Sequence, residues 1–431
     1  MFAGIVGERF TDIRCNLRRK DVNEKNKGEI DIGDRRLKNT TCIIATRTET
    51  KVNKGENMKH TIDDLRQMQS LPLSAKILMT KNRIRDWYEY FDGQVYVSFS
   101  GGKDSTVLLH IARELYPDIK AVFVNTGLEY PEIRQFVKTF DNVTILRPKM
   151  RFDEVIRKYG YPLISKEVSQ CVSQGRIALK TGVEPDDFFA YTELVAINKL
   201  KEITLRNDIP YSFQLQKLLG MLKDKDGNKS TFNQERYKPL LFVDFKISNM
   251  CCNVMKKAPA HAYTKSSGSF PITAQTAKES NLRTRQWLKN GCNGFDMKLP
   301  ISNPMSFWTE QDILQYIKEN NLPIASVYGD VVYKDEDGFI YQDSICGGKL
   351  CTTGCDRTGC VFCAFGAHLD KRGGGRSRFE RLKETHPKQY EYCIGGGEYI
   401  NGVWQPSKEG LGMGHVFDEL NKIYGKDFIK Y

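Results

Sequence analysis

Between residues 94 and 146, short apolar runs alternate with segments whose apolar positions recur at helical spacing. The runs have the length of buried strands and are Val95–Phe99, Ile119–Asn125 and Val143–Leu146. The spacing predicts a helix over Ser105–Tyr116, and Pro131 suits the first turn of another helix reaching Phe140. Strands that alternate with helices in this way predict an α/β fold with a doubly wound parallel sheet.

Helical spacing also precedes this region. Residues 60–90 carry apolar side chains at helical intervals, so residues 58–93 are predicted to form a helical lead-in. Residues 1–57 are mostly polar with little periodicity and are expected to be a weakly ordered extension. We therefore entertain the hypothesis that Met58 is the true start of the protein.

The α/β domain is predicted to extend over residues 94–345. Residues 175–237 have the pattern of a charged, mostly helical insertion that ends in a turn at Asp224–Asn228. The fold pattern resumes with a strand at residues 271–273, a helix over Glu279–Asn290, and a helix that Thr309 caps and that ends at Asn320. Residues 346–431 are rich in Gly and Cys and are expected to fold around a metal rather than around a broad apolar core.

The first strand leads into Ser-Gly-Gly-Lys-Asp-Ser, residues 100–105, which has the character of a phosphate-binding loop. Gly101 and Gly102 allow a tight turn close to an anion, and the amides of the next helix add partial positive charge. Lys103 adds a full positive charge. Asp104 stands where a Walker loop requires Ser or Thr after the lysine, which disfavours a kinase or GTPase. An ordinary glycine turn is the structural alternative.

Composition narrows the class of protein further. The chain of 431 residues has a formal charge of +12, which fits an anionic partner such as a nucleotide or nucleic acid, or only a cationic surface. No apolar run is long enough to cross a bilayer, so we expect a cytoplasmic protein without a membrane partner. In a reducing compartment the 12 cysteines are metal ligands or free thiols rather than disulfide partners.

Four cysteines lie within thirteen residues near the C-terminal end, at Cys351, Cys355, Cys360 and Cys363. This spacing is typical of metal binding, and it suits both an iron–sulfur cluster and zinc. The spacing alone does not choose between these metals. A soft, all-thiolate donor set favours iron–sulfur over zinc. Free buried thiols are the expected state of Cys15, Cys42, Cys171, Cys292 and Cys393.

Residue type assigns roles at the phosphate loop. Lys103, Asp104 and Ser105 are the residues expected to act on the phosphates, by stabilising the charge on departing pyrophosphate and by binding Mg²⁺. Asp104 has an equally strong structural interpretation as a helix cap. Because strands of a parallel sheet end at one edge, the loop Asn125-Thr126-Gly127 is expected to converge on the same site.

The loop resembles the PP-loop of the ATP pyrophosphatases, and four later segments resemble, in order, motifs of the phosphoadenosine phosphosulfate (PAPS) reductase family. These segments are residues 124–132, 161–166, 251–259 and 303–312. The resemblance covers about residues 94–366 and implies an adenine nucleotide alpha hydrolase-like fold. It implies a nucleotide site made of Ser98, Ser100, Gly101, Gly102, Lys103, Ser105, Asn125, Thr126, Gly127 and Lys166. Asn125 replaces a common aspartate, and solvation is the ordinary role of a single lysine such as Lys166.

The same resemblance implies a cluster. Iron–sulfur sulfonucleotide reductases hold a [4Fe–4S] cluster with a Cys-Cys pair and a later Cys-x-x-Cys, which correspond to Cys251, Cys252, Cys360 and Cys363 here. Cys355 also has the context of a ligand and resembles the cysteine-rich PP-loop proteins linked to DNA phosphorothioation. Five cysteines are therefore candidates for four ligand positions on the cluster.

Two differences from sulfonucleotide reductases argue against assigning reductase activity to this chain. Sulfonucleotide reductases carry a C-terminal Glu-Cys-Gly-Leu-His with the nucleophilic thiolate, whereas this chain ends Asp-Phe-Ile-Lys-Tyr. Family members also often have Gly-x-Arg where Ala274-Gln275-Thr276 stands. A basic run between Lys371 and Lys383 either follows a phosphate backbone or is simply solvated.

Three functions remain open. The first is an enzyme that cleaves ATP to AMP and pyrophosphate to adenylate a substrate, coupled to sulfur transfer or redox chemistry at an adjacent cluster, with nucleic acid as a candidate acceptor. The second is a PAPS or adenylyl sulfate reductase, which needs a thiol or a thioredoxin-like reductant from elsewhere. The third is a nucleotide-binding module with structural zinc and no turnover.

Overall fold

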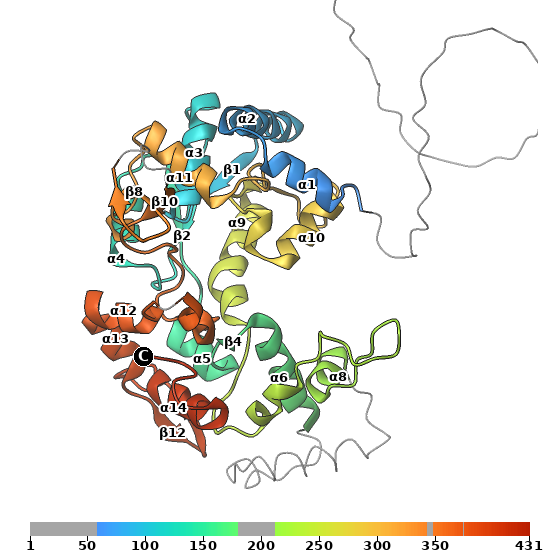
Figure 1. The fold of residues 1–431 in the computed structure, drawn as a ribbon, viewed down its shortest axis with the longest axis vertical. Helices are drawn as coiled ribbons and strands as arrows, with labels where there is room; N and C mark the ends of the chain where they lie inside the picture. The colour runs from blue at the N-terminus through green and yellow to red at the C-terminus, as the bar shows by residue number, and fades with distance from the viewer. Residues whose placement is uncertain (1–57, 180–211, 343–347, 374) are drawn as a thin grey trace, which may run out of the picture. The chain divides into compact units, whose positions relative to one another are not determined.

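The structure is a computed structural model, and it describes residues 58–179, 212–342, 348–373 and 375–431 (Figure 1). The chain divides into two units, Met1–Gly55 and Glu56–Tyr431, and all of the described residues belong to the second. The hypothesis that the protein starts at Met58 and the predicted extension over residues 1–57 therefore concern residues almost entirely outside the description.

A six-stranded sheet in the order β3-β2-β1-β5-β7-β6 forms the centre of the fold. Its strands are β1 (Val95–Ser98), β2 (Ala121–Val124), β3 (Val143–Leu146), β5 (Phe270–Ile272), β6 (Asn293–Gly294) and β7 (Ile301–Ser302). All neighbouring strands are parallel except β6, which is antiparallel to β7. From β1 the chain builds first toward β3 and later, through β5, toward β7. This reversal of direction is the topology of a doubly wound sheet, so the predicted fold class is confirmed.

Thirteen α-helices are described in these residues. They are α1 (Ile62–Gln69), α2 (Leu73–Tyr90), α3 (Lys103–Leu115), α4 (Pro131–Val137), α5 (Phe152–Tyr159), α6 (Lys166–Leu179), α8 (Phe213–Leu219), α9 (Ala258–Ser267), α10 (Asn281–Asn290), α11 (Glu310–Glu319), α12 (Arg378–Thr385), α13 (Pro387–Ile394) and α14 (Met413–Tyr424). Shorter helical turns are η2 (Glu235–Leu241), η3 (Asn253–Lys257), η4 (Ala277–Glu279), η5 (Ser326–Tyr328) and η7 (Ala367–Gly373). The predicted cap of α11 is confirmed, because the Thr309 side chain accepts a hydrogen bond from the Asp312 amide.

Short strands outside the central sheet form three small sheets. They are β4 (Leu163–Ile164) with β11 (Ala364–Phe365), β8 (Val331–Lys334) with β9 (Ile340–Tyr341) and β10 (Lys349–Thr352), and β12 (Glu398–Ile400) with β13 (Val403–Gln405). The parallel pair of β4 and β11 joins segments about 200 residues apart in sequence, and it lies beside the candidate site.

Helix α3 begins two residues earlier than predicted. Gly102 has an extended backbone and is the N-terminal cap, so Lys103 and Asp104 belong to the first turn of the helix. The structural role predicted for Asp104 as the cap is therefore wrong, because no side chain caps this helix. Asp104 lies instead where a carboxylate interacts favourably with the positive end of the helix.

Two apolar cores occupy the described residues. The first, which we call the sheet core, combines the central sheet with α1, α2, α3 and α11, and it includes Trp87, Val97, Leu108, Phe123 and Trp308. Lys76 is buried against this core at 2% exposure, where its ammonium lies 2.7 Å from the Asp312 carboxylate. This ion pair connects α2 to α11 across the core.

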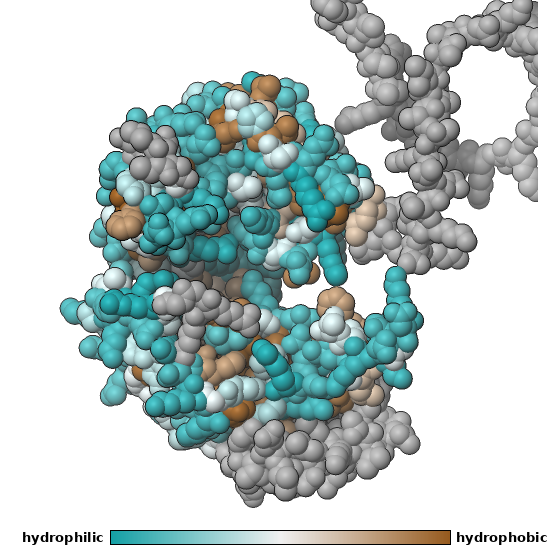
Figure 2. Space-filling model, in the orientation of Figure 1, coloured by the Kyte–Doolittle hydropathy of each residue, from teal (hydrophilic) through white to brown (hydrophobic). Residues whose placement is uncertain are grey.

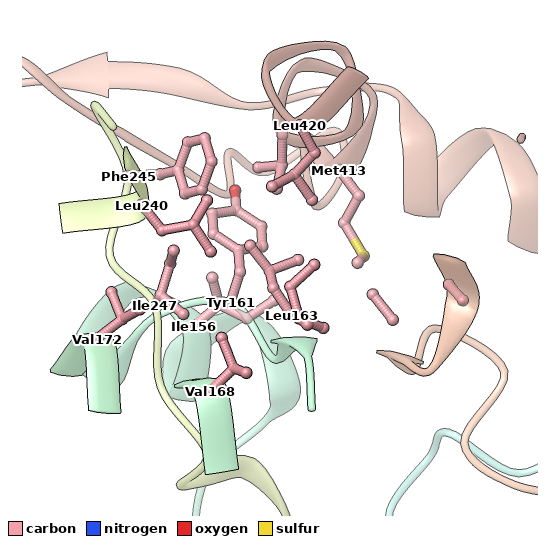
Figure 3. Packing of buried hydrophobic residues seen from close by; sticks show 14 of the residues in the cluster. Ile156, Tyr161, Leu163, Val168, Val172, Leu240, Phe245, Ile247, Met413 and Leu420 are labelled. Carbon is pink, nitrogen blue, oxygen red and sulfur yellow. The ribbon is translucent and has the colours of Figure 1, made fainter. Parts of the chain in front are cut away.

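The second core, which we call the C-terminal core, packs α5, α6 and β4 against residues 213–255 and the C-terminal helices. Figure 3 shows Tyr161 and Leu163 among Leu240 and Phe245 on one side and Leu420 on the other. The Tyr161 hydroxyl donates a hydrogen bond of 2.7 Å to the Leu411 carbonyl. The expectation that residues 346–431 lack a broad apolar core is therefore wrong, because their apolar residues are buried against partners distant in sequence.

The predicted insertion over residues 175–237 is described only in part, since residues 180–211 lie outside the description. Its turn at Asp224–Asn228 is present, with the Asp224 carboxylate accepting from the Asn228 amide at 2.8 Å. Leu215 and Leu218 of α8 are buried in the C-terminal core, so this segment contributes to the fold rather than lying outside it.

Hydrophilic residues cover most of the face drawn in Figure 2, and apolar residues appear there as small separate patches. Within the described ranges, no helix combines the length and the apolar character that crossing a membrane requires.

A substitution at Gly101 tests whether the phosphate loop needs a glycine at this position. Its φ is +72°, and a Cβ there would lie 2.7 Å from Val137 Cγ2 and 2.8 Å from Ile133 Cγ2. We expect Gly101→Ala to lower the free energy of unfolding by roughly 2–5 kcal/mol, combining the left-handed backbone with overpacking. Gly227→Ala is the control, with φ +80° and no atom within 4 Å, and it is expected to cost about 1–2 kcal/mol. Equal losses in urea unfolding would contradict the steric account.

Candidate nucleotide site and cysteine centre

The phosphate loop is held by its own serines. The Ser105 hydroxyl accepts from the Ser100 amide at 3.2 Å and donates to the Gly102 carbonyl at 2.9 Å. The Ser100 hydroxyl accepts from the Gly102 amide at 3.3 Å. Ser98 is the last residue of β1 and pairs with Val122 of β2. These contacts fix a tight loop at the carboxyl end of the strand.

Lys103 is the most constrained residue of the loop. Its side chain is 5% exposed, and its ammonium lies 3.2 Å from Glu310, 3.4 Å from Asp104 and 3.1 Å from the Asp356 carbonyl. Burial lowers the pKa of Lys103, but the two carboxylates more than offset this effect, so the pKa is raised and the side chain is cationic at neutral pH.

A cavity of about 190 Å³ opens beside this ammonium. Lys103, Asp104 and Glu310 line one part of it, and Glu279 and Arg357 line another. It lies where the order of strands reverses between β1 and β5, the usual ligand position in a doubly wound sheet. Its volume suits phosphate groups rather than a whole nucleotide, since sites for drug-sized ligands measure about 300–1,000 Å³.

The second loop follows β2 and is closed by Glu129. The buried Glu129 carboxylate accepts from the Thr126 amide at 3.0 Å and from the Thr126 hydroxyl at 2.7 Å. The Asn125 side chain accepts from the Gly127 amide at 3.1 Å. Asn125, Thr126 and Gly127 lie at the same edge of the sheet as the phosphate loop, but they line a different cavity of about 430 Å³.

Four cysteines from two distant segments lie close together. Cys252, Cys360 and Cys363 lie near enough to Cys251 to raise its pKa, and Cys252 lies near enough to Cys363 to add to the rise that burial causes in the pKa of Cys363. The sulfur atoms of Cys251 and Cys252 are 3.9 Å apart. The structure therefore brings together the four cysteines that the resemblance to iron–sulfur reductases assigned to one centre.

Charge around these thiols is mixed. Burial raises the pKa of Cys360 to about 11, the nearby Lys256 opposes the rise, and Cys363 adds to it. Burial lowers the pKa of Lys256, but Cys360 and Glu129 more than offset it, so the pKa is raised. The hydrogen bond from Cys251, together with Lys166 and Lys256, lowers the pKa of Cys252. Cations next to buried thiols stabilise their thiolate forms, which are the forms that bind metals.

The loop at residues 161–165 explains why the two cysteine segments meet. On one side, the Tyr161 amide donates a hydrogen bond to the Lys246 carbonyl at 2.8 Å, and the Tyr161 carbonyl accepts one from the Ser248 amide at 3.0 Å, three residues before Cys251. On the other side, β4 pairs with β11, directly after Cys363. Ile164 has φ +63°, an unfavourable backbone for a β-branched residue, and its carbonyl accepts from the Gly366 amide at 2.8 Å. The strained residue is thus held between the two segments.

Residues 355–366 connect all three loops of the site, and we call them the bridging segment. Its Asp356 carbonyl accepts from Lys103 of the phosphate loop, its Val361 amide donates to Leu128 of the second loop at 2.8 Å, and its Gly366 amide donates to Ile164. The bridging segment therefore passes from the phosphate loop to the cysteine group along one edge of the fold.

Cys355 begins the bridging segment but has different neighbours from the other four cysteines. It hydrogen-bonds to Tyr130, and burial together with this thiol raises the pKa of Tyr130 to about 12. Burial raises the pKa of Cys355, while Arg381 opposes the rise. The structure thus separates Cys355 from the group of four.

The sulfur positions bear on the type of metal. Among the described residues, no three Cys, His, Asp or Glu side chains gather closely enough around one point to hold a single metal ion. A structural zinc ion requires four ligands at about 2.0–2.3 Å from one centre. In a four-iron cluster each cysteine binds a different iron atom, so its ligands need not converge on one point.

Some residues of the site belong to no recognisable sequence motif and were not predicted. Tyr328 accepts from the Lys103 amide at 3.1 Å, and Glu310 pairs with the Lys103 side chain, although both come from segments far from the loop. Lys166, predicted near the nucleotide, is exposed at the start of α6 and influences Cys252; it is not among the residues that line either cavity described above. Arg147 and Lys149 follow β3, and the rule that ligands bind at carboxyl ends of strands could have indicated them.

The fold and the loop after β1 define an α/β protein of the PP-loop type. The model of the phosphoadenosine phosphosulfate reductase domain matches residues 94–163 and 198–365, together more than half of the chain. The chain therefore belongs to the phosphoadenosine phosphosulfate reductase family. The predicted family is confirmed.

The individual proteins that match share limited sequence identity with this chain. The chain is 28% identical over 170 residues to an uncharacterised protein of Methanocaldococcus jannaschii, covering 36% of this chain and 39% of that protein. It is 26% identical over 90 residues to an adenosine 5′-phosphosulfate reductase of Bacillus cereus, covering 20% of this chain and 38% of the relative. The matches thus span less than two-fifths of each relative. A PAPS reductase structure from Candida auris matches with 14% identity and a TM-score of 0.29, over 63% of this chain and 92% of that one.

The Arg378 side chain holds the bridging segment in place, and its substitution tests this role. Its guanidinium donates to the carbonyls of Cys363 at 3.1 Å and Phe365 at 2.9 Å and pairs with Asp370 at 2.8 Å. We expect Arg378→Met to destabilise the protein by roughly 3 kcal/mol, because it leaves a partly buried carboxylate unpaired. The control is Arg376→Met, which removes an exposed pair with Glu384 and is expected to cost at most about 1 kcal/mol. Urea unfolding measures both, and similar losses would contradict this role.

Proposed function

We propose that this protein cleaves ATP to AMP and pyrophosphate, adenylates a substrate, and couples this step to sulfur transfer or redox chemistry at an adjacent iron–sulfur cluster. The observation that carries the proposal is the bridging segment, which contacts Lys103 at one end and includes Cys360 and Cys363 near the other. A protein that used only one of the two centres would not need to join them covalently within so few residues.

The phosphate chemistry follows from the residues of the loop. The substrate oxygen attacks the α phosphorus, the bond to the bridging oxygen breaks, and pyrophosphate leaves with the electron pair. Lys103 and the amides at the start of α3 stabilise the charge that develops on pyrophosphate. Asp104 and Glu310 would supply carboxylate oxygens for Mg²⁺, which would offset negative charge on the phosphates.

Cys251, Cys252, Cys360 and Cys363 fit a [4Fe–4S] cluster, because they form a soft, all-thiolate donor set from two segments of the chain. Such a cluster supplies one-electron chemistry or a site that binds sulfur. Lys256 and Lys166 offset the negative charge of the thiolates, and Arg378 donates hydrogen bonds to the carbonyls of Cys363 and Phe365. Zinc is the alternative metal.

A sulfonucleotide reductase is the second candidate, and the family and the similarity to an adenosine 5′-phosphosulfate reductase favour it. In that reaction a thiolate attacks the sulfonyl sulfur and displaces the nucleotide phosphate. A second thiol, as from a thioredoxin-like protein, then attacks the first sulfur, which releases sulfite and leaves a disulfide. The products distinguish the two candidates, because the reductase forms sulfite and consumes no ATP.

Lys103→Ala tests the nucleotide step. We expect the rate of AMP and pyrophosphate formation to fall about 100-fold or more, because one donor to developing charge is lost. Lys120→Ala, at the opposite end of β2, is the control and should retain full activity. Chromatography of the products from radiolabelled ATP measures both variants. Formation of ADP, or an unchanged rate in Lys103→Ala, would overturn the proposal, and sulfite from a sulfonucleotide would replace it with the second candidate.

The cysteine assignment is tested by metal content. After anaerobic purification, Cys360→Ser is expected to lose most of its iron and sulfide, whereas Cys355→Ser should retain both, because Cys355 lies apart from the four grouped thiols. Iron, sulfide and zinc analysis of the wild type and both variants provides the measurement. Equal iron loss in both variants would place Cys355 among the ligands, and stoichiometric zinc without iron would identify the alternative metal.

A further inference from the structure

The larger cavity at the carboxyl edge of the sheet is lined by Asn125, Thr126 and Gly127, and the phosphate chemistry at Lys103 does not use it. Its volume is about 430 Å³, and it lies between the second loop and the segment that follows β3. No residue of the phosphate loop lines it, so it is distinct from the cavity at Lys103. A cavity of this size accommodates a ligand the size of a nucleotide.

One wall of the cavity is cationic. Arg147 and Lys149 are exposed, and neither forms an ion pair within the described residues. Arg151 pairs with Asp153 at 2.7 Å, yet its side chain is 75% exposed. Three basic residues at alternate positions of one short segment, two of them without a counter-charge, favour a ligand that carries negative charge.

A second part of the cavity wall is aromatic. Phe362 stacks with Phe152 at 6.4 Å between ring centres and contacts Tyr392 at 6.0 Å. Tyr392 is partly exposed at this wall. An exposed aromatic ring and exposed cations in the lining of one cavity are the combination that binds a base and its phosphate.

The cations argue against the adenosine of ATP as the occupant. The phosphates of ATP are assigned to Lys103, and adenosine itself is uncharged. Adenosine alone offers no negative charge to Arg147 and Lys149, whereas the phosphate of a second nucleotide does. The position also suits an acceptor, because Phe362 lies between Cys360 and Cys363 and because Asn125–Gly127 form part of the rim.

We propose that this cavity binds a nucleotide unit of the acceptor, with its phosphate on Arg147 and Lys149 and its base against the exposed ring of Tyr392. The assignment to the acceptor rests on the proposed function. The nucleotide is either free or part of a single strand, since both present the same base and phosphate.

The test measures binding of two probes to the full-length protein, a fluorescein-labelled ten-thymidine DNA strand and thymidine monophosphate. The variant is Arg147→Glu with Lys149→Glu, and its control is Lys120→Glu with Lys138→Glu, an equal charge change on exposed lysines that do not line the cavity. We expect at least tenfold weaker binding in the variant only. Tyr392→Ala is expected to weaken binding about fivefold or more through the loss of stacking.

Affinity for ATP is measured on the same samples and should not change in the Arg147/Lys149 variant. If ATP affinity falls together with probe binding, the cavity belongs to the ATP site and the inference is overturned. It is equally overturned if neither probe binds, or if the variant and the control bind alike. Strand binding without mononucleotide binding identifies a nucleic acid, and comparable binding of both probes identifies a free nucleotide.

Lys103→Ala separates this inference from the proposed function. It should abolish AMP formation and leave probe binding intact. If the wild type binds a probe through Arg147 and Lys149 but forms no AMP from ATP, the adenylation reaction is wrong while the nucleotide cavity stands.

Discussion

The backbone hydrogen bonds of the bridging segment are the constraint on which the site depends. Residues 355–366 contact Lys103 after β1, Leu128 after β2 and Ile164 of β4, in the order in which these loops occur along the chain. Two of the three contacts involve amides and carbonyls alone, so they do not depend on which side chains are present. A shift of this segment would disturb the phosphate loop and the grouped cysteines together.

The two cores give this constraint its rigidity. The sheet core fixes the carboxyl ends of β1 and β2, while the C-terminal core fixes β4 through Tyr161 and its neighbours. The bridging segment passes from one core to the other, with Val361 and Phe362 buried in the second. The site is thus built where two independently packed regions meet. The strained Ile164 persists there because hydrogen bonds on both sides hold the backbone.

Much of the fold was predictable, because the sheet is encoded locally. The runs at β1, β2 and β3 and the cap at Thr309 are visible in short windows of sequence. The C-terminal core was not predictable in the same way, since its apolar residues find partners hundreds of residues away. Within the site, Gly101 and Lys103 follow from a local motif, whereas Tyr328 and Glu310 reach the loop only through tertiary packing. The separation of Cys355 from the other cysteines also depends on tertiary structure and could not be predicted from the sequence.

The central claim is that the nucleotide loop and the cysteine centre are joined through the bridging segment. The most direct measurement is the electron paramagnetic resonance spectrum of the anaerobic, dithionite-reduced protein with and without α,β-methylene-ATP. The account predicts a cluster signal whose line shape changes when the analogue binds, because binding at Lys103 displaces the Asp356 carbonyl and moves the segment that carries Cys360. A cluster signal identical in both samples, at a concentration where analogue binding is saturated, would contradict it.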